Sequence, residues 1–583
     1  MLKKQNRLST FFLYLKLLRK WGFKQKKKFI IANIFMLIVA MATSMYPIII
    51  DFAFNVISEK NKQYIFLLPV LILGVTIIKG CAYYLQTVFV GMIANSIIRD
   101  IQFNLYNKVL DFDVTIFNSQ NAGSLQSRFI NDLNILKESI TRTLNNLVRD
   151  VFILLGLIIS MFYLDWVLTL CVILVYPICI RPIILIGKKT RDISLKLQKK
   201  ISEASAFLSE SFSAIRVIKT YNLEDLQKKI ATKKFENIYK GNIKIIRVRA
   251  KIEPTLEIIG GIAISIVLVL AGIRILNDSS DIGSFTGFIS ALLIAVQPAR
   301  ALGTLNTILQ EGAASLIRLE DLLKKKSLID VTKSKNIFSS IEGKIKFSNV
   351  YYYYNYEEYT LKKINCVIKP GEQVVIVGAN GSGKSTFINL IPRLMDPVKG
   401  NVYIDDQNIK KFTVKSLRES IALVSQDVIL FDMSIIKNIS IANPKASKAE
   451  IIEASKKADA HNFIIKLKKS YNTITGDRGL NLSGGERQKI SIARALIKNP
   501  RILLMDEATS ALDNQSESKV NKVLKSFKNN ITTLVVAHRL TTILEAKRII
   551  YFDNGNILAD GSHKSLIKNN AHYRRHFYNV FKK

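Results

Sequence analysis

Long runs of apolar residues occupy the first half of the chain and limit what it can fold into. Residues 29–50 contain no formally charged side chain over 22 positions, and about 20 apolar residues suffice to cross a bilayer core. This run is longer than the apolar part of a cleavable signal peptide, so we expect it to remain in the membrane as a helix. With the later runs, we predict six membrane spans, at 29–50, 64–94, 140–164, 166–187, 256–276 and 282–305.

The formal net charge of +39 raises the question of a nucleic-acid partner. Residues 188–251 contain 17 Lys and Arg against 6 Asp and Glu, whereas the short connection 277–282 contains two acidic residues and no basic one. A Lys-rich composition accounts for part of the excess, but the difference between the loops follows the positive-inside rule. We therefore expect both termini in the cytoplasm and no nucleic-acid partner.

The connections between the predicted spans differ in length on the two sides of the membrane. The predicted outer turns are short, whereas the inner segments 95–139 and 188–253 are long, polar and mostly free of Pro and Gly. Such segments favour helices that continue past the membrane surface. Residues 9–23 place basic side chains among apolar ones at helical spacing, which predicts an amphipathic helix on the cytoplasmic face. We therefore divide this half into an N-terminal segment, 1–28, and an α-helical transmembrane domain, 29–323.

The composition changes after the transmembrane domain. A charged linker, 324–340, leads into a region, 341–583, of short apolar runs punctuated by Gly and Asp. Residues 373–377 form a buried-strand pattern followed by a Gly-rich turn, and 502–505 form another that ends in acidic residues. This alternation predicts an α/β domain. The four cysteines have no metal-ligand spacing, so we assign them no site.

The Gly-rich turn at 378–385 reads Gly-Ala-Asn-Gly-Ser-Gly-Lys-Ser and matches the phosphate-binding loop of P-loop proteins. Its glycines let backbone N–H groups close around phosphate oxygens at the start of a helix. Lys384 is suited to the β- and γ-phosphates of a nucleotide and Ser385 to Mg²⁺, although a Gly-rich turn without a ligand is the simpler alternative. The predicted nucleotide-binding residues of this stretch are Gly378, Ala379, Asn380, Gly381, Ser382, Gly383, Lys384, Ser385 and Thr386.

Two further patterns carry chemistry. Asp506 and Glu507 end the strand at 502–505, where Asp506 is suited to bind Mg²⁺ and Glu507 to activate a water molecule. Two adjacent acids also occur at ordinary helix starts. Upstream, however, the sequence Leu-Ser-Gly-Gly-Glu at 482–486 opens a predicted helix with a second anion-binding turn. One chain therefore carries two turns suited to phosphate.

With these motifs together, the second domain resembles the ATPase domain of ABC proteins, and 482–486 resembles its signature motif. The resemblance implies ATP and Mg²⁺ as cofactors, with ATP bound between the phosphate loop of one subunit and the signature residues of another. The chain would then act as a homodimer, and a heterodimer stays open. The implied signature residues are Ser483, Gly484, Gly485 and Glu486.

The same resemblance implies roles for residues that follow in the family's order. Gln426 and His538 would act in catalysis beside Glu507, Tyr354 would stack on adenine, and Asp513 would belong to the D-loop. The implied Mg²⁺ ligands are Ser385, Gln426 and Asp506.

The first domain resembles that of type I ABC exporters over almost all of its length. Within these exporters, 147–166 and 297–302 resemble segments of bacterial lipid flippases of the lipid A type. The resemblance implies ATP-driven export or flipping of an anionic lipid across the bacterial inner membrane. It also implies a substrate cavity that contains Lys79, Arg149 and Arg300.

Other interpretations of these residues and of the whole chain stay open. Lys79 can extend toward the membrane surface, and Arg149 can pair with Asp150. Adjacent residues on a helix point about 100° apart, so we expect a poor pair there. A multidrug exporter of the same fold and a nucleotide-gated regulator without ATP turnover are alternative functions, although Glu507 argues against the regulator.

Overall fold

The computed structural model describes residues 17, 19, 21–60, 62–119, 122–276, 281–325, 329, 336–337, 341–354, 358–509, 512–526, 530–537 and 539–581. Most of the predicted N-terminal amphipathic helix, most of the linker, and His538 lie outside these residues. The chain divides into two compact units, one formed by Met1–Lys108 and Gly123–Lys325 and the other by Val109–Ala122 and Lys326–Lys583.

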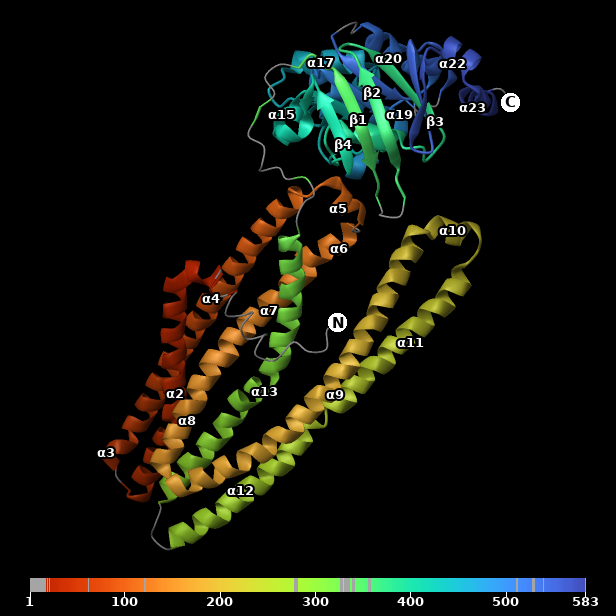
Figure 1. The fold of residues 1–583 in the computed structure, drawn as a ribbon. Helices are drawn as coiled ribbons and strands as arrows, with labels where there is room; N and C mark the ends of the chain where they lie inside the picture. Colours follow the sequence, from red (N-terminus) through yellow and green to blue (C-terminus); the bar gives the residue numbers. More distant parts are fainter. Residues whose placement is uncertain are drawn as a thin grey trace. The chain divides into compact units, whose positions relative to one another are not determined.

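The first unit consists of helices, which Figure 1 shows as long coiled ribbons. Two of its segments, η2 and η3, are π-helical turns. Its elements are η1 (Gly22–Gln25), α2 (Lys26–Ser58), α3 (Lys62–Ile65), α4 (Leu67–Leu110), α6 (Ala122–Ser127), η2 (Arg128–Asp132), α7 (Leu133–Leu144), η3 (Asn145–Arg149), α8 (Asp150–Leu164), α9 (Trp166–Ser213), α10 (Ile215–Thr220), α11 (Glu224–Arg249), α12 (Ile252–Leu276) and α13 (Ile282–Lys324).

Within the described part of the chain, four helical stretches are long and apolar enough to cross a membrane. They are Lys26–Ser58, Gln63–Leu110, Leu125–Leu164 and Ile282–Leu302. These stretches coincide with the first, second, third and sixth predicted spans. The fifth predicted span falls on a shorter apolar helix, Gly260–Leu276, and the fourth lies within α9. The count of six spans stays a prediction.

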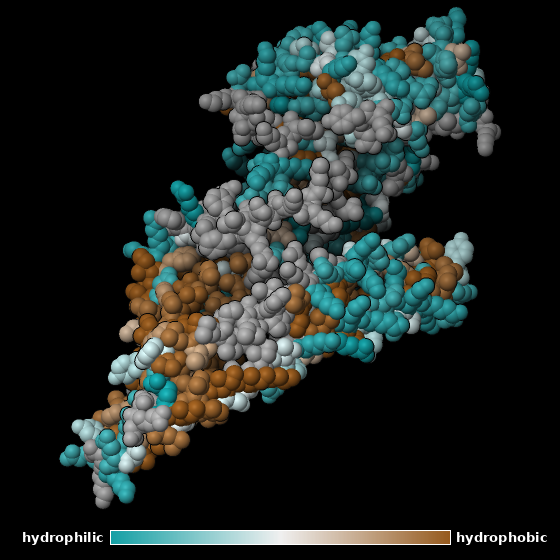
Figure 2. All heavy atoms as spheres, turned by 60° about the horizontal axis from the view of Figure 1, so that its bottom comes forward, coloured by the Kyte–Doolittle hydropathy of each residue, from teal (hydrophilic) through white to brown (hydrophobic). Residues whose placement is uncertain are grey.

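Apolar side chains are exposed on the outer surfaces of these helices. Met41, Leu73 and Ile159 keep 59, 61 and 68 % of their surface exposed. Figure 2 shows hydrophobic residues gathered over this part of the first unit. A soluble protein rarely exposes so large an apolar surface, whereas lipid tails cover it without cost. This surface therefore agrees with a membrane-embedded domain.

Small residues let α8 and α13 approach α2 closely. A Cβ atom added to Gly156 of α8 would lie 2.1 Å from Ser44 Oγ, and one added to Gly287 of α13 would lie 2.6 Å from the carbonyl oxygen of Pro47. Ser160 Oγ donates a hydrogen bond to the carbonyl oxygen of Ser44 at 2.8 Å. Close backbone approach of this kind stabilises helix pairs in membranes, where van der Waals packing replaces the hydrophobic effect.

The turn between α8 and α9 is held by the carboxylate of Asp165. Asp165 caps the start of α9 and accepts hydrogen bonds from the backbone N–H groups of Val167 and Leu168. Its other oxygen accepts from Arg274 Nε of α12 at 3.0 Å. The side chain of Asp165 is 2 % exposed, and this pairing offsets the cost of burying its charge.

The long polar segments form helices, as predicted. The helix α9 has 48 residues, which corresponds to about 70 Å and exceeds the bilayer core more than twofold. It packs against α11, and α10 joins the two at their shared end, as Figure 1 shows.

The second unit combines two sheets with short helices. One sheet has the strand order β2-β1-β4-β5 and the other β10-β9-β3-β8-β7-β6. Its strands are β1 (Ile345–Tyr352), β2 (Leu361–Ile368), β3 (Gln373–Gly378), β4 (Lys399–Ile404), β5 (Gln407–Asn408), β6 (Ile421–Val424), β7 (Ile502–Asp506), β8 (Thr532–Val536), β9 (Arg548–Asp553) and β10 (Asn556–Gly561). Its helices are α5 (Val114–Ser119), α14 (Lys384–Leu390), η4 (Ile409–Lys411), α15 (Val414–Glu419), α16 (Ile435–Ser440), α17 (Lys448–Lys457), α18 (His461–Lys466), η5 (Ser470–Asn472), η6 (Asp477–Gly479), α19 (Gly484–Ile497), α20 (Asn514–Ser526), α21 (Leu540–Leu544), α22 (His563–Asn569) and α23 (Ala571–Phe581).

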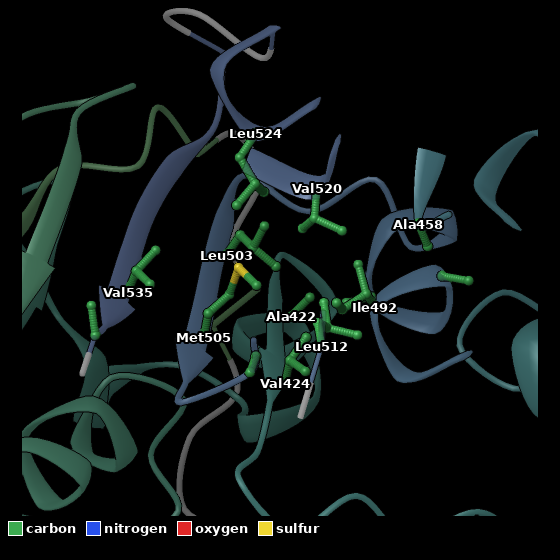
Figure 3. Packing of buried hydrophobic residues seen from close by; sticks show 14 of the residues in the cluster. Ala422, Val424, Ala458, Ile492, Leu503, Met505, Leu512, Val520, Leu524 and Val535 are labelled. Carbon is green, nitrogen blue, oxygen red and sulfur yellow. The ribbon is translucent and has the colours of Figure 1, made fainter. Parts of the chain in front are cut away.

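The strands of the larger sheet are buried on both faces. Along β7, Leu503 and Met505 belong to one hydrophobic cluster, and Ile502 and Leu504 belong to the other. Figure 3 shows Leu503 and Met505 on the side of the sheet that faces Ile492 of α19. Strands buried on both faces form continuous apolar runs, which explains why 502–505 are apolar throughout.

Candidate active site

The site lies at the carboxyl ends of neighbouring parallel strands. In the sheet, β3 pairs with β8, β8 with β7, and β7 with β6, all in parallel. The Gly-rich turn begins at the last residue of β3, Gln426 follows β6, and Asp506 ends β7 with Glu507 directly after it. Because parallel strands end at the same edge of a sheet, these motifs come together although they are far apart in the sequence.

The Gly-rich turn requires glycine for two different reasons. At Gly381 the backbone φ is +79°, which side chains with a Cβ rarely adopt, although the space around it is open. At Gly383, with φ at +101°, a Cβ atom would also lie 2.8 Å from Leu361 Cδ2 and 2.9 Å from the carbonyl oxygen of Thr360. A larger residue at Gly383 would therefore strain the turn and collide with its support.

Lys384 is folded back over the turn that precedes it. Its Nζ donates to the carbonyl oxygens of Gly378 and Ala379 at 2.7 and 2.8 Å. Burial lowers the pKa of Lys384, while the charges of Glu507 and Asp506 oppose this shift. The ammonium group is thus held at the turn and within electrostatic range of both carboxylates, where an anionic phosphate would favour its charged form.

Four oxygen-bearing side chains lie near Lys384 and form two hydrogen-bonded pairs. Ser385 Oγ donates to Asp506 Oδ1 at 3.1 Å, and Gln426 Nε2 donates to Glu507 Oε2 at 2.8 Å. Asp506 is 8 % exposed, whereas Ser385 and Gln426 are exposed. The structure therefore brings together Lys384, Ser385, Gln426 and the two acids. Sequence reasoning placed each of these residues but missed the contact between Gln426 and Glu507.

Glu507 has an uncommon backbone conformation. Its φ is +50°, a left-handed value that residues other than Gly, Asn and Asp seldom adopt. Its carbonyl oxygen accepts from Gln488 Nε2 of α19 at 3.3 Å. Strained residues of this kind concentrate at functional sites. The role of Gln488 was also missed, since nothing local in the sequence marks it.

Tyr354 lies next to α14, the helix that follows the Gly-rich turn. Its hydroxyl oxygen is 3.2 Å from Thr386 Oγ1, and its ring meets that of Tyr352 edge to face at 5.1 Å. The side chain is 47 % exposed. An exposed aromatic ring beside the phosphate-binding turn is suited to stack on a base.

The second turn that we predicted to bind phosphate, at 482–486, starts a separate helix. Ser483 and Glu486 form a capping box at the start of α19, in which each side chain accepts from the other's backbone N–H. Asp513 is held by Ser516, whose backbone N–H donates to Asp513 Oδ1 at 2.9 Å. This bond keeps the pKa of Asp513 at about 2, so the carboxylate stays ionised at neutral pH.

Each half of the chain matches a model of a known protein family. Residues 29–299 match the model of the ABC transporter transmembrane region, and 361–510 match that of the ABC transporter. The ATP-dependent lipid A-core flippase of Syntrophus aciditrophicus is 33 % identical over 548 residues, which are 94 % of this chain and 91 % of that protein. The chain belongs to the ABC transporter family. Its fused membrane and ATPase regions couple ATP hydrolysis to transport.

A second relative supports this ABC transporter assignment, and a solved structure shares the fold. The lipid A-core flippase of Desulfotalea psychrophila is 34 % identical over 545 residues, covering 93 % of this chain and 95 % of the relative. A bacterial Atm1-family ABC exporter with ATP bound matches the fold at a TM-score of 0.83 and 23 % identity, over 96 % of this chain and 99 % of that one. The predicted order, a helical membrane domain followed by an α/β ATPase domain, is confirmed.

The predicted cavity bases of this ABC transporter lie on three helices. Lys79 of α4 places Nζ 4.7 Å from the centre of the Tyr46 ring, and Arg149 lies 5.7 Å from that of Tyr83. Arg300 is exposed on α13. Both contacts with tyrosine are of cation–π type.

The expectation of a poor pair between Arg149 and Asp150 was wrong. Arg149 Nε donates to Asp150 Oδ1 at 2.7 Å, and a second guanidinium nitrogen lies equally close. The Cβ vectors of adjacent residues do diverge, but the long Arg side chain bends back to reach the short carboxylate. Asp150 is buried, with 2 % of its side chain exposed, and leaving its charge unpaired in a membrane span would cost several kcal/mol.

Proposed function

We propose that this ABC transporter exports or flips an anionic lipid from the cytoplasmic side of a bacterial inner membrane. The observation that carries the proposal is the similarity to lipid A-core flippases over more than nine-tenths of the chain. In such a membrane the substrate would present phosphate or carboxylate groups beside apolar tails.

The basic residues of the spans support an anionic substrate. A charged side chain near the centre of a span costs about 2.5–3.5 kcal/mol on insertion scales, so such charges are commonly functional. Asp150 binds two nitrogens of the Arg149 guanidinium, but the Arg149 side chain stays 20 % exposed. A headgroup oxygen can therefore approach the guanidinium and compete with Asp150 for its N–H groups.

We propose further that ATP binds at the Gly-rich turn together with Mg²⁺. Hydroxyl, carboxylate and amide oxygens suit Mg²⁺, which binds few protein ligands and takes the rest from phosphate and water. Ser385, Asp506 and Gln426 meet this requirement, and the ion would neutralise charge on the phosphates. His538 would contact the γ-phosphate, and Glu507 would orient and deprotonate the attacking water.

Two copies of the chain would form two shared sites in a homodimer. The signature residues Ser483–Glu486 begin a helix of their own, and an ABC site needs them opposite the phosphate-binding turn of another subunit. The family resemblance of both turns within one chain supports this arrangement.

Lipid-dependent ATP hydrolysis tests the substrate class. We expect purified protein in vesicles with lipid A to hydrolyse ATP faster than in vesicles of zwitterionic lipid alone. Replacing Lys79, Arg149 and Arg300 together by Gln should remove this stimulation and leave basal hydrolysis near normal, because the catalytic residues lie in the other unit.

The matched control replaces Lys229, Lys233 and Lys240 of α11 by Gln, which removes the same charge from exposed positions. If the cavity variant kept full stimulation, or if a cationic drug stimulated better than lipid A, a multidrug exporter would be the better assignment.

A further inference from the structure

A buried carboxylate lies four residues after Asp513 in the sequence. Glu517 of α20 is 3 % exposed, and burying an ionised carboxylate costs several kcal/mol unless it is paired. Its Oε2 accepts from Arg539 Nη1 at 2.7 Å, and its Oε1 accepts from Thr542 Oγ1 at 2.9 Å. Both carboxylate oxygens are therefore bound by residues that follow β8.

The partners of Glu517 belong to two segments of the proposed catalytic machinery. Arg539 directly follows His538 in the sequence. A second nitrogen of the same guanidinium, Nη2, donates to the carbonyl oxygen of Leu512 at 2.5 Å, and Leu512 directly precedes Asp513. The Arg539 side chain therefore links Glu517 to the residue that precedes Asp513.

The helix that carries Glu517 is also bound to the signature helix. Ser516 Oγ lies within 2.9 Å of both Asp513 Oδ2 and Asp459 Oδ2. Asp459 in turn accepts from Lys489 Nζ of α19 at 2.8 Å and from Lys519 Nζ at 3.0 Å. The start of α20 is therefore connected by polar contacts to α19, to Asp513 and to the segment after β8.

We propose that Glu517 is a positioning residue for ATP hydrolysis: through Arg539 it fixes the residue that follows His538 in the chain against the residue that precedes Asp513. The inference rests on the proposed roles of His538 and Asp513. Glu517 binds their neighbours in the chain, so it acts on the geometry of hydrolysis more than on the binding of nucleotide. Its loss should lower kcat and leave the KM for ATP almost unchanged.

Replacing Glu517 by Gln tests this inference in the full-length protein. Gln keeps the shape and one acceptor oxygen but removes the charge that fixes Arg539. We expect kcat to fall about tenfold or more and KM for ATP to change less than about twofold. The matched control is Glu372→Gln, which breaks an ion pair with Arg548 next to the opposite end of β3. This control should hydrolyse ATP at close to the parental kcat, whatever its melting temperature.

A milder variant covers the case in which Glu517→Gln does not fold. Thr542→Val removes only the hydroxyl that donates to Oε1 and conserves volume, so we expect a smaller fall in kcat, again without a change in KM. The inference is overturned if the folded variants hydrolyse ATP at the parental kcat, or if KM rises while kcat stays at the parental value.

A third variant, His538→Ala, distinguishes a failure of the proposed role of His538 from a failure of the inferred role of Glu517. If it is fully active, the proposed role of His538 fails; if it is inactive while both other variants are normal, only the role of Glu517 fails.

Discussion

Glu507 shows how a single residue combines backbone strain with a defined side-chain contact. Its left-handed backbone turns the chain directly after β7, and Gln426 and Gln488 hold its carboxylate and its carbonyl oxygen. Because these contacts come from β6 and α19, the position of the carboxylate depends on three elements. A side chain fixed in this way is suited to orient a water molecule, since its reorganisation during the reaction is small.

We predict that Glu507→Gln nearly abolishes ATP turnover but preserves ATP binding. The amide can still contact Gln426, yet it cannot accept a proton from water at neutral pH. We expect at least a hundredfold loss of kcat, typical for removal of a general base, and nucleotide affinity within a few fold of the parent. Steady-state hydrolysis and equilibrium binding of a fluorescent ATP analogue measure the two quantities. Hydrolysis at the parental rate would exclude Glu507 as the base.

At the level of secondary-structure elements, α2 is held by small residues of its neighbours. Gly156 and Ser160 of α8 face Ser44, and Gly283 and Gly287 of α13 face the α2 backbone. Both pairs are four residues apart, so each lies on one face of its helix. The membrane domain thus uses close backbone contact on two sides of one helix.

We predict that Gly287→Val destabilises the membrane domain. Its Cβ would lie 2.6 Å from the carbonyl oxygen of Pro47, and overpacking of this kind costs about 1–3 kcal/mol. A thermal melt in detergent should show a lower transition temperature. Gly80→Val is the matched control, because no atom lies within 4 Å of a Cβ at Gly80, and it should melt like the parent. Equal melting of both variants would contradict the packing argument.

For the whole molecule, the two turns that we predict to bind phosphate start different helices, and this separation would have a functional consequence. The turn at 378–385 follows β3, whereas the signature residues start α19 and are stabilised by their own capping box. If ATP needs both turns, the pairing of two chains decides whether a site is complete. A defect in one turn would then be complemented by a second chain.

We predict that mixing two inactive variants restores activity. Lys384→Ala removes charge from the phosphate turn, and Ser483→Arg blocks the signature turn. In a mixed dimer both defects fall on one shared site, and the other site contains two intact turns. ATPase activity should therefore rise above that of either variant alone after the subunits are dissociated and reassembled. No recovery, with mixed dimers demonstrated by two affinity tags, would count against shared sites.

Features that depend on neighbouring residues were predicted from the sequence. A membrane span needs only an apolar run of sufficient length, so 29–50 indicated a span without any tertiary contact. The phosphate turn is likewise contiguous, and Gly381, Gly383, Lys384 and Ser385 are recognisable by their order. The alternation of strands and helices after 341 predicted the α/β domain in the same way.

Contacts between distant parts of the chain required the folded structure. Gln426 and Glu507 meet because β6 and β7 end at the same edge of a parallel sheet, which no local pattern encodes. Arg149 pairs with Asp150 because a flexible side chain bends back, against the direction that helical spacing indicates. Glu517 was not singled out at all, since its function depends on Arg539, which a separate strand brings to it. Local motifs therefore identified the chemistry, and the register of the sheet and the side-chain conformations determined which residues support it.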